Sequence, residues 1–142
     1  MLLVDVNVLV YAFRRDAPDH EQYAQWLREL MDSDAAFGMA DLVLSGFMRI
    51  ITHPAIFDPP SSSALALAFV NQVRRHPHCM TVAPGARHWD IFLSLCAATG
   101  ATGSLVPDAY LAALAIESGC EWITTDRDFA RFRGLRWRHP LD

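Results

Sequence analysis

Apolar and polar positions follow one another along the chain in short blocks that predict strands separated by helices. Apolar residues fill positions 2–4 and 8–10, which is the composition of a strand buried on both faces. Further strands are predicted over 36–40, 80–83, 121–125 and 135–138. Apolar residues at helical spacing predict helices over 19–31, 41–52, 64–75, 87–98, 107–118 and, more briefly, 126–132.

Strands that alternate with helices in this way predict an α/β fold class with a mostly parallel central sheet. With 142 residues, 52% of them hydrophobic and 20% charged, the chain is long and apolar enough to form one domain over residues 1–142. Uninterrupted apolar runs such as the one at 64–70 are far short of the ~20 residues of a membrane span. No signal peptide is evident and the three cysteines lie far apart, so we expect a cytoplasmic protein.

Four aspartates lie where a predicted strand ends or a predicted helix begins: Asp5, Asp41, Asp108 and Asp126. Each position also suits a helix N-cap, a role for which aspartate is a favoured residue. Capping explains Asp5 less well, because this residue interrupts an apolar run, and Asp108 less well, because it follows a proline. The carboxyl ends of parallel strands meet at one edge of a sheet, where ligands bind. The four side chains are therefore candidates for a shared site.

Carboxylates that converge on one site repel one another unless they are protonated or bridged by a cation. Oxygen ligands without a matching set of histidines or cysteines favour Mg²⁺ or Mn²⁺ over Zn²⁺. Mg²⁺ held by a few aspartates keeps positions open for phosphate oxygens and activates a bound water. The pattern therefore predicts metal-assisted hydrolysis of a phosphodiester.

Other phosphate-handling sites lack an essential residue in this sequence. The chain contains no lysine, so the glycine-containing loop at 100–104 is not a P-loop, and the segment 5–7 is not the site of an aspartyl-phosphate phosphatase or receiver domain. Ser45 lacks the flanking glycines of a nucleophile elbow. The histidines and cysteine of 76–79 have no second pair of zinc ligands, which favours a surface turn.

The net charge of −4 argues against a general nucleic-acid binder, although the distribution of charge leaves a second interpretation open. All twelve basic residues are arginines, and five of them lie among aromatic residues within 127–138. Interleaved arginines and aromatics can bind phosphates and stack on bases. The same pattern is typical of a solvated helix followed by a charged edge strand.

The order and spacing of these motifs resemble the PIN-domain nucleases, and within them the VapC-type toxins of bacterial toxin–antitoxin pairs. The matching segments are "LLVDVNVLVYAF", "SGFMRIITHPAIF" and "VPDAYLAALAIESGCEWITTDRDFARF", so the resemblance spans essentially the whole chain. It implies a three-layer α/β/α sandwich and Mg²⁺- or Mn²⁺-dependent endoribonuclease activity. It also implies inhibition by a cognate antitoxin and, usually, a homodimer.

The resemblance also implies roles for individual residues. Asp5 and Asp108 correspond to metal ligands, and Asp126 to the acid that completes the cluster or orients a metal-bound water. Asn7 and Thr125 correspond to groups that hydrogen-bond the ligands or the phosphate. Asp128 is a further candidate that either joins the acids or faces solvent.

Many members of this family carry a glutamate where this sequence has Gly46. Either the site works with three acids, or Asp41, at the start of the same helix, supplies the fourth. Arg49 shares a helix face with Asp41 and Ser45, so it is expected to pair with Asp41, to hold the scissile phosphate, or to be an ordinary surface arginine. Two alternatives to the ribonuclease remain: a catalytically impaired module that binds RNA or protein, and a metal-dependent phosphatase or DNA nuclease.

Overall fold

A computed structural model describes residues 1–142 and places five strands in a single sheet. The strand order is β3-β2-β1-β4-β5, and every neighbouring pair is parallel. The strands are β1 (Leu2–Val4), β2 (Phe37–Met39), β3 (Cys79–Thr81), β4 (Glu121–Ile123) and β5 (Trp137–Arg138). Because β1 is the middle strand, the residue that follows it lies at the centre of the edge where all the carboxyl ends meet.

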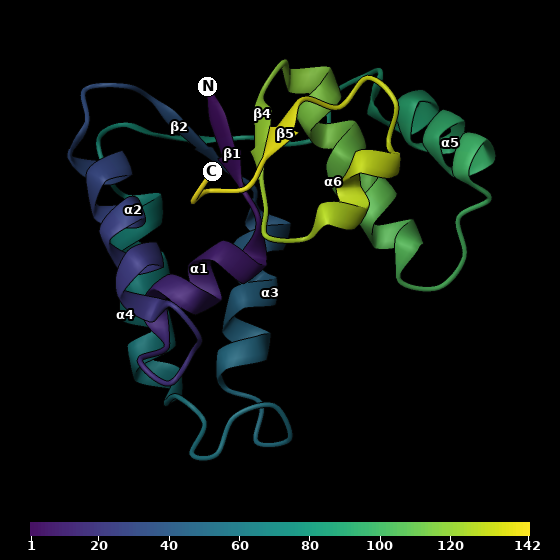
Figure 1. Ribbon diagram of the computed structural model, residues 1–142. Helices are drawn as coiled ribbons and strands as arrows, with labels where there is room; N and C mark the ends of the chain where they lie inside the picture. Colours follow the sequence, from purple (N-terminus) through teal and green to yellow (C-terminus); the bar gives the residue numbers. More distant parts are fainter.

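Six α-helices and one 3₁₀-helix surround this sheet. They are α1 (Val6–Phe13), α2 (His20–Asp32), α3 (Asp41–Ile51), α4 (Ser63–Arg74), α5 (His88–Thr99), α6 (Leu105–Ser118) and the 3₁₀-helix η1 (Arg127–Arg131). Helices α1 to α4 lie on one side of the sheet and α5 and α6 on the other (Figure 1). The predicted three-layer α/β/α sandwich with a parallel sheet is confirmed.

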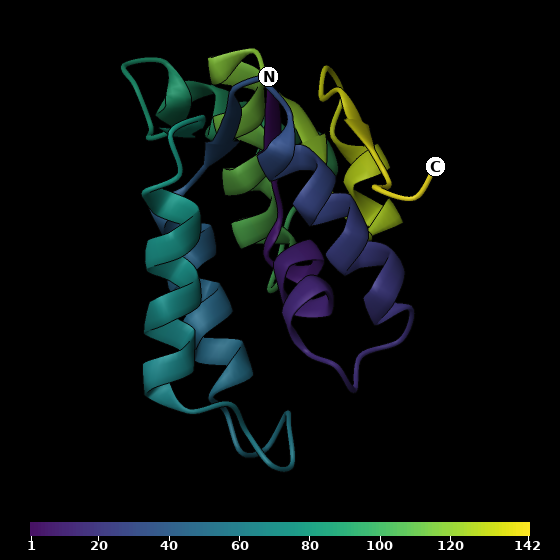
Figure 2. The ribbon, with the colours of Figure 1, turned by 90° about the vertical axis from the view of Figure 1, so that its left-hand side faces the viewer.

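Helices α3 and α4 pair as a long hairpin that extends beyond the carboxyl ends of the strands (Figure 2). The hairpin is anchored by aromatic side chains, since Phe47 of α3 packs against Phe13 and Phe69 with ring centroids 5.5 and 4.7 Å away. Phe47 is fully buried. The face of α3 that carries Phe47 is therefore packed against the core, which sets the rotation of the helix about its axis.

The core continues through the sheet, where the largest fully buried side chains are those of Trp122, Phe37, Phe47 and Phe129. Strand β2 contains Gly38 because its neighbours leave no room for a side chain. A Cβ atom there would lie 2.9 Å from Val82 Cγ2 and 3.2 Å from Leu3 Cδ1. This close packing holds β1 and β2 in register.

One predicted element is wrong. The apolar run from residue 2 to residue 10 is not a single strand, because β1 ends at Val4 and the chain continues as helix α1. Val8, Leu9 and Val10 are buried as expected, but against the helical layer. The other predicted helices and strands are confirmed, with ends that move by at most two residues. None of the helices has the length and apolar character needed to cross a membrane.

Candidate active site

Asp5 lies at the junction of β1 and α1, in an extended conformation that makes it the N-cap of the helix. Its Oδ1 accepts a hydrogen bond from the backbone N–H of Val6 at 2.7 Å, and its own N–H donates to the carbonyl of Ile123 at 2.9 Å. The side chain is almost completely buried, with 3% of the residue exposed. Asp5 is thus fixed between the two central strands, and the corrected end of β1 explains why it interrupts the apolar run.

A buried threonine holds the second oxygen of this carboxylate. Thr124 donates its hydroxyl to Asp5 Oδ2 at 2.6 Å and accepts the side-chain N–H of Asn7 at 3.3 Å and the backbone N–H of Asp126 at 3.0 Å. One donor and two acceptor positions are all that a hydroxyl has, so this group is fully used. The side-chain N–H of Asn7 also reaches Asp5 Oδ2, at 3.2 Å. Four residues from two distant parts of the chain therefore form one hydrogen-bonded frame.

The role expected for Thr125 belongs to its neighbour. Thr125 contributes only its backbone N–H, which donates to Asn7 Oδ1 at 3.2 Å. The hydroxyl that holds the acid is that of Thr124, which is completely buried. Sequence reasoning missed Thr124 because both threonines are adjacent and follow the last residue of β4, Ile123. Alternation along "EWITT" would not have separated them, because Trp122, Ile123 and Thr124 are all buried.

Asp108 lies in the first turn of α6, one residue after Pro107, as predicted. It is half-buried, and its carboxylate makes no hydrogen bond. Burial raises the pKa of this carboxyl above its ordinary value, and the negative charges of Asp126 and Asp128 raise it further. The partial positive charge at the start of the helix acts in the opposite sense and favours the ionised form. Asp108 is therefore the least constrained oxygen donor of the site.

Asp126 follows β4 and caps the 3₁₀-helix η1, where its Oδ1 accepts the backbone N–H of Asp128 at 2.9 Å. Its second oxygen is free of such bonds. Asp128 itself is exposed, and its side chain influences the site only through its charge, which raises the pKa of Asp108. Of the two acids near η1, Asp126 is thus the one that belongs to the site.

Asp5, Asp108 and Asp126 come together at one cavity of about 370 Å³, at the carboxyl edge of the sheet. Its wall also includes Asn7, two residues of α6 and one of η1, and a row of residues along α3. The full set is Asp5, Val6, Asn7, Leu42, Ser45, Gly46, Arg49, Pro107, Asp108, Leu111, Asp126 and Phe129. Three separate segments of the chain therefore supply the three acids that the sequence singled out.

Asp41 does not reach this cavity, and its predicted use as a fourth acid is wrong. It is the first residue of α3, with Ala40 as the N-cap, and it forms an ion pair with Arg74 of α4 in which Arg74 Nε lies 2.9 Å from Asp41 Oδ1. The hydrogen bond from Arg74 lowers the pKa of the Asp41 carboxyl. The expected pairing of Asp41 with Arg49 is excluded for the same reason. Arg49 instead lines the cavity.

The negative charges of the three aspartates in the cavity repel one another. Burial raises the pKa of Asp5 to about 6, an effect that the hydrogen bonds from Thr124 and Val6 oppose and that the charges of Asp108 and Asp126 reinforce. No group of three or more histidine, cysteine, aspartate or glutamate side chains lies close enough together in this structure to hold a metal ion. Asp5, Asp108 and Asp126 line the cavity as separate carboxylates.

Comparison with known proteins identifies the family. The PIN domain model matches residues 2–135. Ribonuclease VapC43 of Mycobacterium tuberculosis is 46% identical over 142 residues, a match that covers 100% of this chain and 97% of the relative. The chain belongs to the VapC family of PIN-domain proteins.

Solved structures have the same fold as this VapC-family chain at much lower sequence identity. VapBC-1 from nontypeable Haemophilus influenzae matches with a TM-score of 0.70 and 10% identity, covering 99% of this chain and 98% of that one. A toxin–antitoxin complex from Klebsiella pneumoniae matches with a TM-score of 0.60 and 17% identity, covering 99% and 98%. The VapC fold therefore persists where most side chains have changed.

Proposed function

We propose that this VapC-family chain is the toxin of a toxin–antitoxin pair and acts as a Mg²⁺-dependent endoribonuclease. The observation that carries the proposal is the convergence of Asp5, Asp108 and Asp126 on one cavity. The ribonuclease names of relatives such as VapC43 give the reaction class. The toxin–antitoxin complex from Klebsiella pneumoniae, which has the same fold, supports a protein partner.

The acids of the cavity fit Mg²⁺ or Mn²⁺ because they offer oxygen donors with unused capacity. A carboxylate accepts about four hydrogen bonds or metal contacts in total. Asp5 has used three of them on Val6, Thr124 and Asn7, so one position remains for a cation. Asp108 has used none, and Asp126 has used one on the backbone of Asp128. When bound, the metal would polarise the scissile phosphate and lower the pKa of a bound water.

The chain's own residues would then have distinct tasks. Asp5 is held too firmly to move, so it would set the position of the cation, while Thr124 and Asn7 keep its carboxylate oriented. Asp108 is free of hydrogen bonds and would adjust to the metal and its waters. Asp126 has one free oxygen, which suits it to accept a proton from an attacking water.

The experiment that tests this proposal measures cleavage of purified transfer RNA and ribosomal RNA in Mg²⁺, with EDTA as the metal-free reference. Asp5→Asn and Asp108→Asn should each lower the rate by more than about 100-fold, because a metal contributes several kcal/mol to transition-state stabilisation. Asp34→Asn is the matched control, since Asp34 is exposed and does not line the cavity.

Each alternative predicts a different result in the same assay. Binding of RNA without cleavage by the wild type would indicate the catalytically impaired module instead, and cleavage of duplex DNA alone would indicate a DNA nuclease. The absence of a fourth acid at Gly46 does not by itself favour the impaired module, because three acids still meet at the cavity. Inhibition by a co-expressed antitoxin, and a homodimer in sedimentation experiments, are the further expectations of the proposal.

A further inference from the structure

The wall of the acidic cavity that faces α3 carries one cation. Leu42, Ser45, Gly46 and Arg49 line the cavity, and each lies three or four residues from at least two of the others, so they form a single stripe along the helix. The charged residues of the wall are the three aspartates and Arg49. A cation in this position lies on the side of the cavity that the carboxylates do not occupy.

Arg49 is exposed, and its guanidinium makes neither a hydrogen bond nor an ion pair, although it lines the same cavity as three acids. An ion pair requires the charged atoms to lie within 4.0 Å, so a gap separates Arg49 from Asp5, Asp108 and Asp126. The acid at the start of its own helix, Asp41, is held by Arg74. The guanidinium of Arg49 therefore has no ion-pair partner in the chain.

Among the α3 residues that line the cavity, Gly46 is the one without a side chain, and it lies between Ser45 and Arg49. Crowding does not require this glycine, because a Cβ atom there would meet only Val6 Cγ2, at 3.7 Å. A glycine inside a helix costs up to about 1 kcal/mol relative to alanine. The glycine thus opens the cavity wall at a position where the fold would accept a larger residue.

We propose that Arg49 binds a phosphate of the RNA strand next to the one that is cut, and that the strand crosses α3 over Gly46. This inference rests on the proposed ribonuclease function and assigns a substrate contact to it. An arginine suits the task because its planar guanidinium binds two phosphate oxygens at once. The cation offsets the repulsion that three carboxylates exert on the RNA backbone. Arg49 is therefore a positioning residue that holds substrate, separate from the acids that hold the metal.

The first test measures RNA binding in a protein that does not cleave. A fluorescently labelled single-stranded RNA oligonucleotide is titrated with Asp5→Asn protein, with and without Arg49→Gln, over a series of salt concentrations. Loss of one phosphate contact should reduce the slope of log affinity against log salt by about 0.7. Arg28→Gln is the matched control, because Arg28 is also exposed and unpaired but lies on α2.

The second test separates positioning from catalysis in the cleaving enzyme. Arg49→Gln should raise KM for RNA by about tenfold or more, since a charge-assisted contact is lost, and change kcat by less than about twofold. Arg49→Lys should keep the salt slope and lose part of the affinity, because an ammonium group makes no bidentate contact.

The outcomes distinguish this inference from the proposed function. If the wild type cleaves RNA but Arg49→Gln matches Arg28→Gln in salt slope and KM, the assignment of Arg49 is overturned and the ribonuclease stands. A fall in kcat without a change in KM would also overturn it, since it would place Arg49 in the chemical step. If the wild type neither binds nor cleaves RNA, both proposals fail.

Discussion

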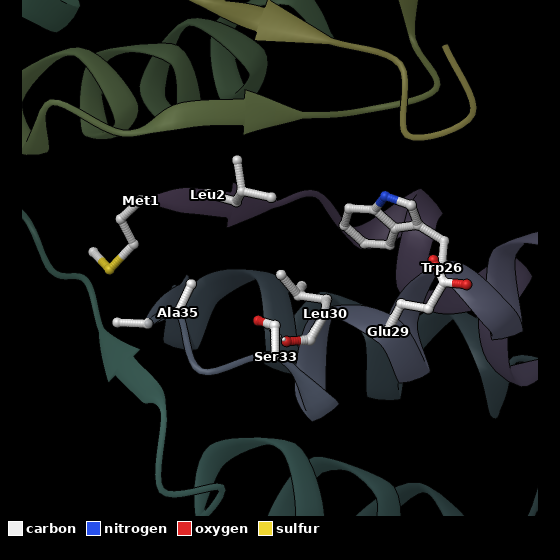
Figure 3. Close-up of a pocket in the computed structure, with 8 residues that line it drawn as sticks. Met1, Leu2, Trp26, Glu29, Leu30, Ser33 and Ala35 are labelled. Atoms are coloured by element: carbon white, nitrogen blue, oxygen red, sulfur yellow. Dashed lines mark hydrogen bonds between the residues drawn. The ribbon is translucent and has the colours of Figure 1, made fainter.

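Two cavities of similar size and opposite character adjoin β1. Leu2 of β1 and Trp26 and Leu30 of α2 line one of about 450 Å³, which lies between this strand and α2 (Figure 3). Beyond the carboxyl end of β1 lies the acidic cavity of about 370 Å³. The first has one charged side chain, that of Glu29, which is exposed and accepts a hydrogen bond from Gln25 at 2.8 Å.

The difference shows that cavity size does not identify a site in this fold. Because all five strands are parallel, the loops that follow them meet at the carboxyl edge, and polar residues from distant segments gather there. Between α2 and β1 the chain brings together mostly apolar residues, with Glu29 as the charged side chain among them. At the carboxyl edge the chain places Asp5 and Asp108, whose carboxyl pKa values are raised. In this setting the ionised carboxylates are disfavoured when no cation is bound.

The largest contrast between the two cavities should appear in how the free energy of unfolding depends on pH in the absence of metal. The pKa of Asp5 rises from 3.8 in the unfolded chain to about 6 in the folded protein, so the folded state binds the proton more tightly. The free energy of unfolding should therefore fall as the pH rises from about 4 to about 6. Two pKa units correspond to roughly 3 kcal/mol.

Urea unfolding in EDTA across this pH range checks the prediction. Asp5→Asn should be more stable than the wild type above pH 6, and the difference should vanish near pH 4. Glu29→Gln, in the apolar cavity, should follow the wild type at every pH, because the Glu29 carboxylate is exposed. A stabilisation by Asp5→Asn that does not change with pH would contradict the prediction.

The next effect concerns the frame around Asp5. Thr124→Val removes the hydroxyl that donates to Asp5 at 2.6 Å and leaves the N–H groups of Asn7 and Asp126 without this acceptor. Loss of a group that orients a metal ligand typically lowers activity by about 10–100-fold. We therefore expect kcat/KM for RNA to fall in that range.

Thr125→Val is the matched control, because Thr125 uses only its backbone N–H at the site. Its kcat/KM should stay close to that of the wild type, with circular dichroism confirming that both variants fold. An equal loss of activity in the two variants would show that the hydroxyl of Thr124 has no special role.

Sequence patterns predicted the order of the elements and the three acids, because both depend on local information. Alternation of apolar runs reveals which segments are buried, and Asp5, Asp108 and Asp126 each interrupt or follow such a run. The conformation of residues 6–10 was not predictable in this way. Apolar residues buried on most sides have the same pattern in a strand and in a helix, so periodicity cannot separate the two.

Pairings across the chain were the other limit. The partner of Asp41 is Arg74, 33 residues away, and the hydroxyl that holds Asp5 is 119 residues away. Spacing along one helix suggested Arg49 for Asp41, because a single sequence reveals neighbours only within an element. Tertiary packing places α4 beside α3. Arg74 of α4 therefore pairs with Asp41, and Arg49 remains without a partner.

The smallest predicted effect compares two glycines that differ in their surroundings. Gly46 lies in the interior of α3, where an added Cβ would make an ordinary contact with Val6, so Gly46→Ala should stabilise the protein by up to about 1 kcal/mol. Gly38 lies in β2, where an added Cβ would approach Val82 Cγ2 to 2.9 Å, so Gly38→Ala should destabilise it. Urea unfolding of both variants checks the opposite signs. Because a methyl group is small, RNA cleavage by Gly46→Ala should persist. A stabilised variant that still cleaves would show that neither the fold nor the activity requires a glycine at this position.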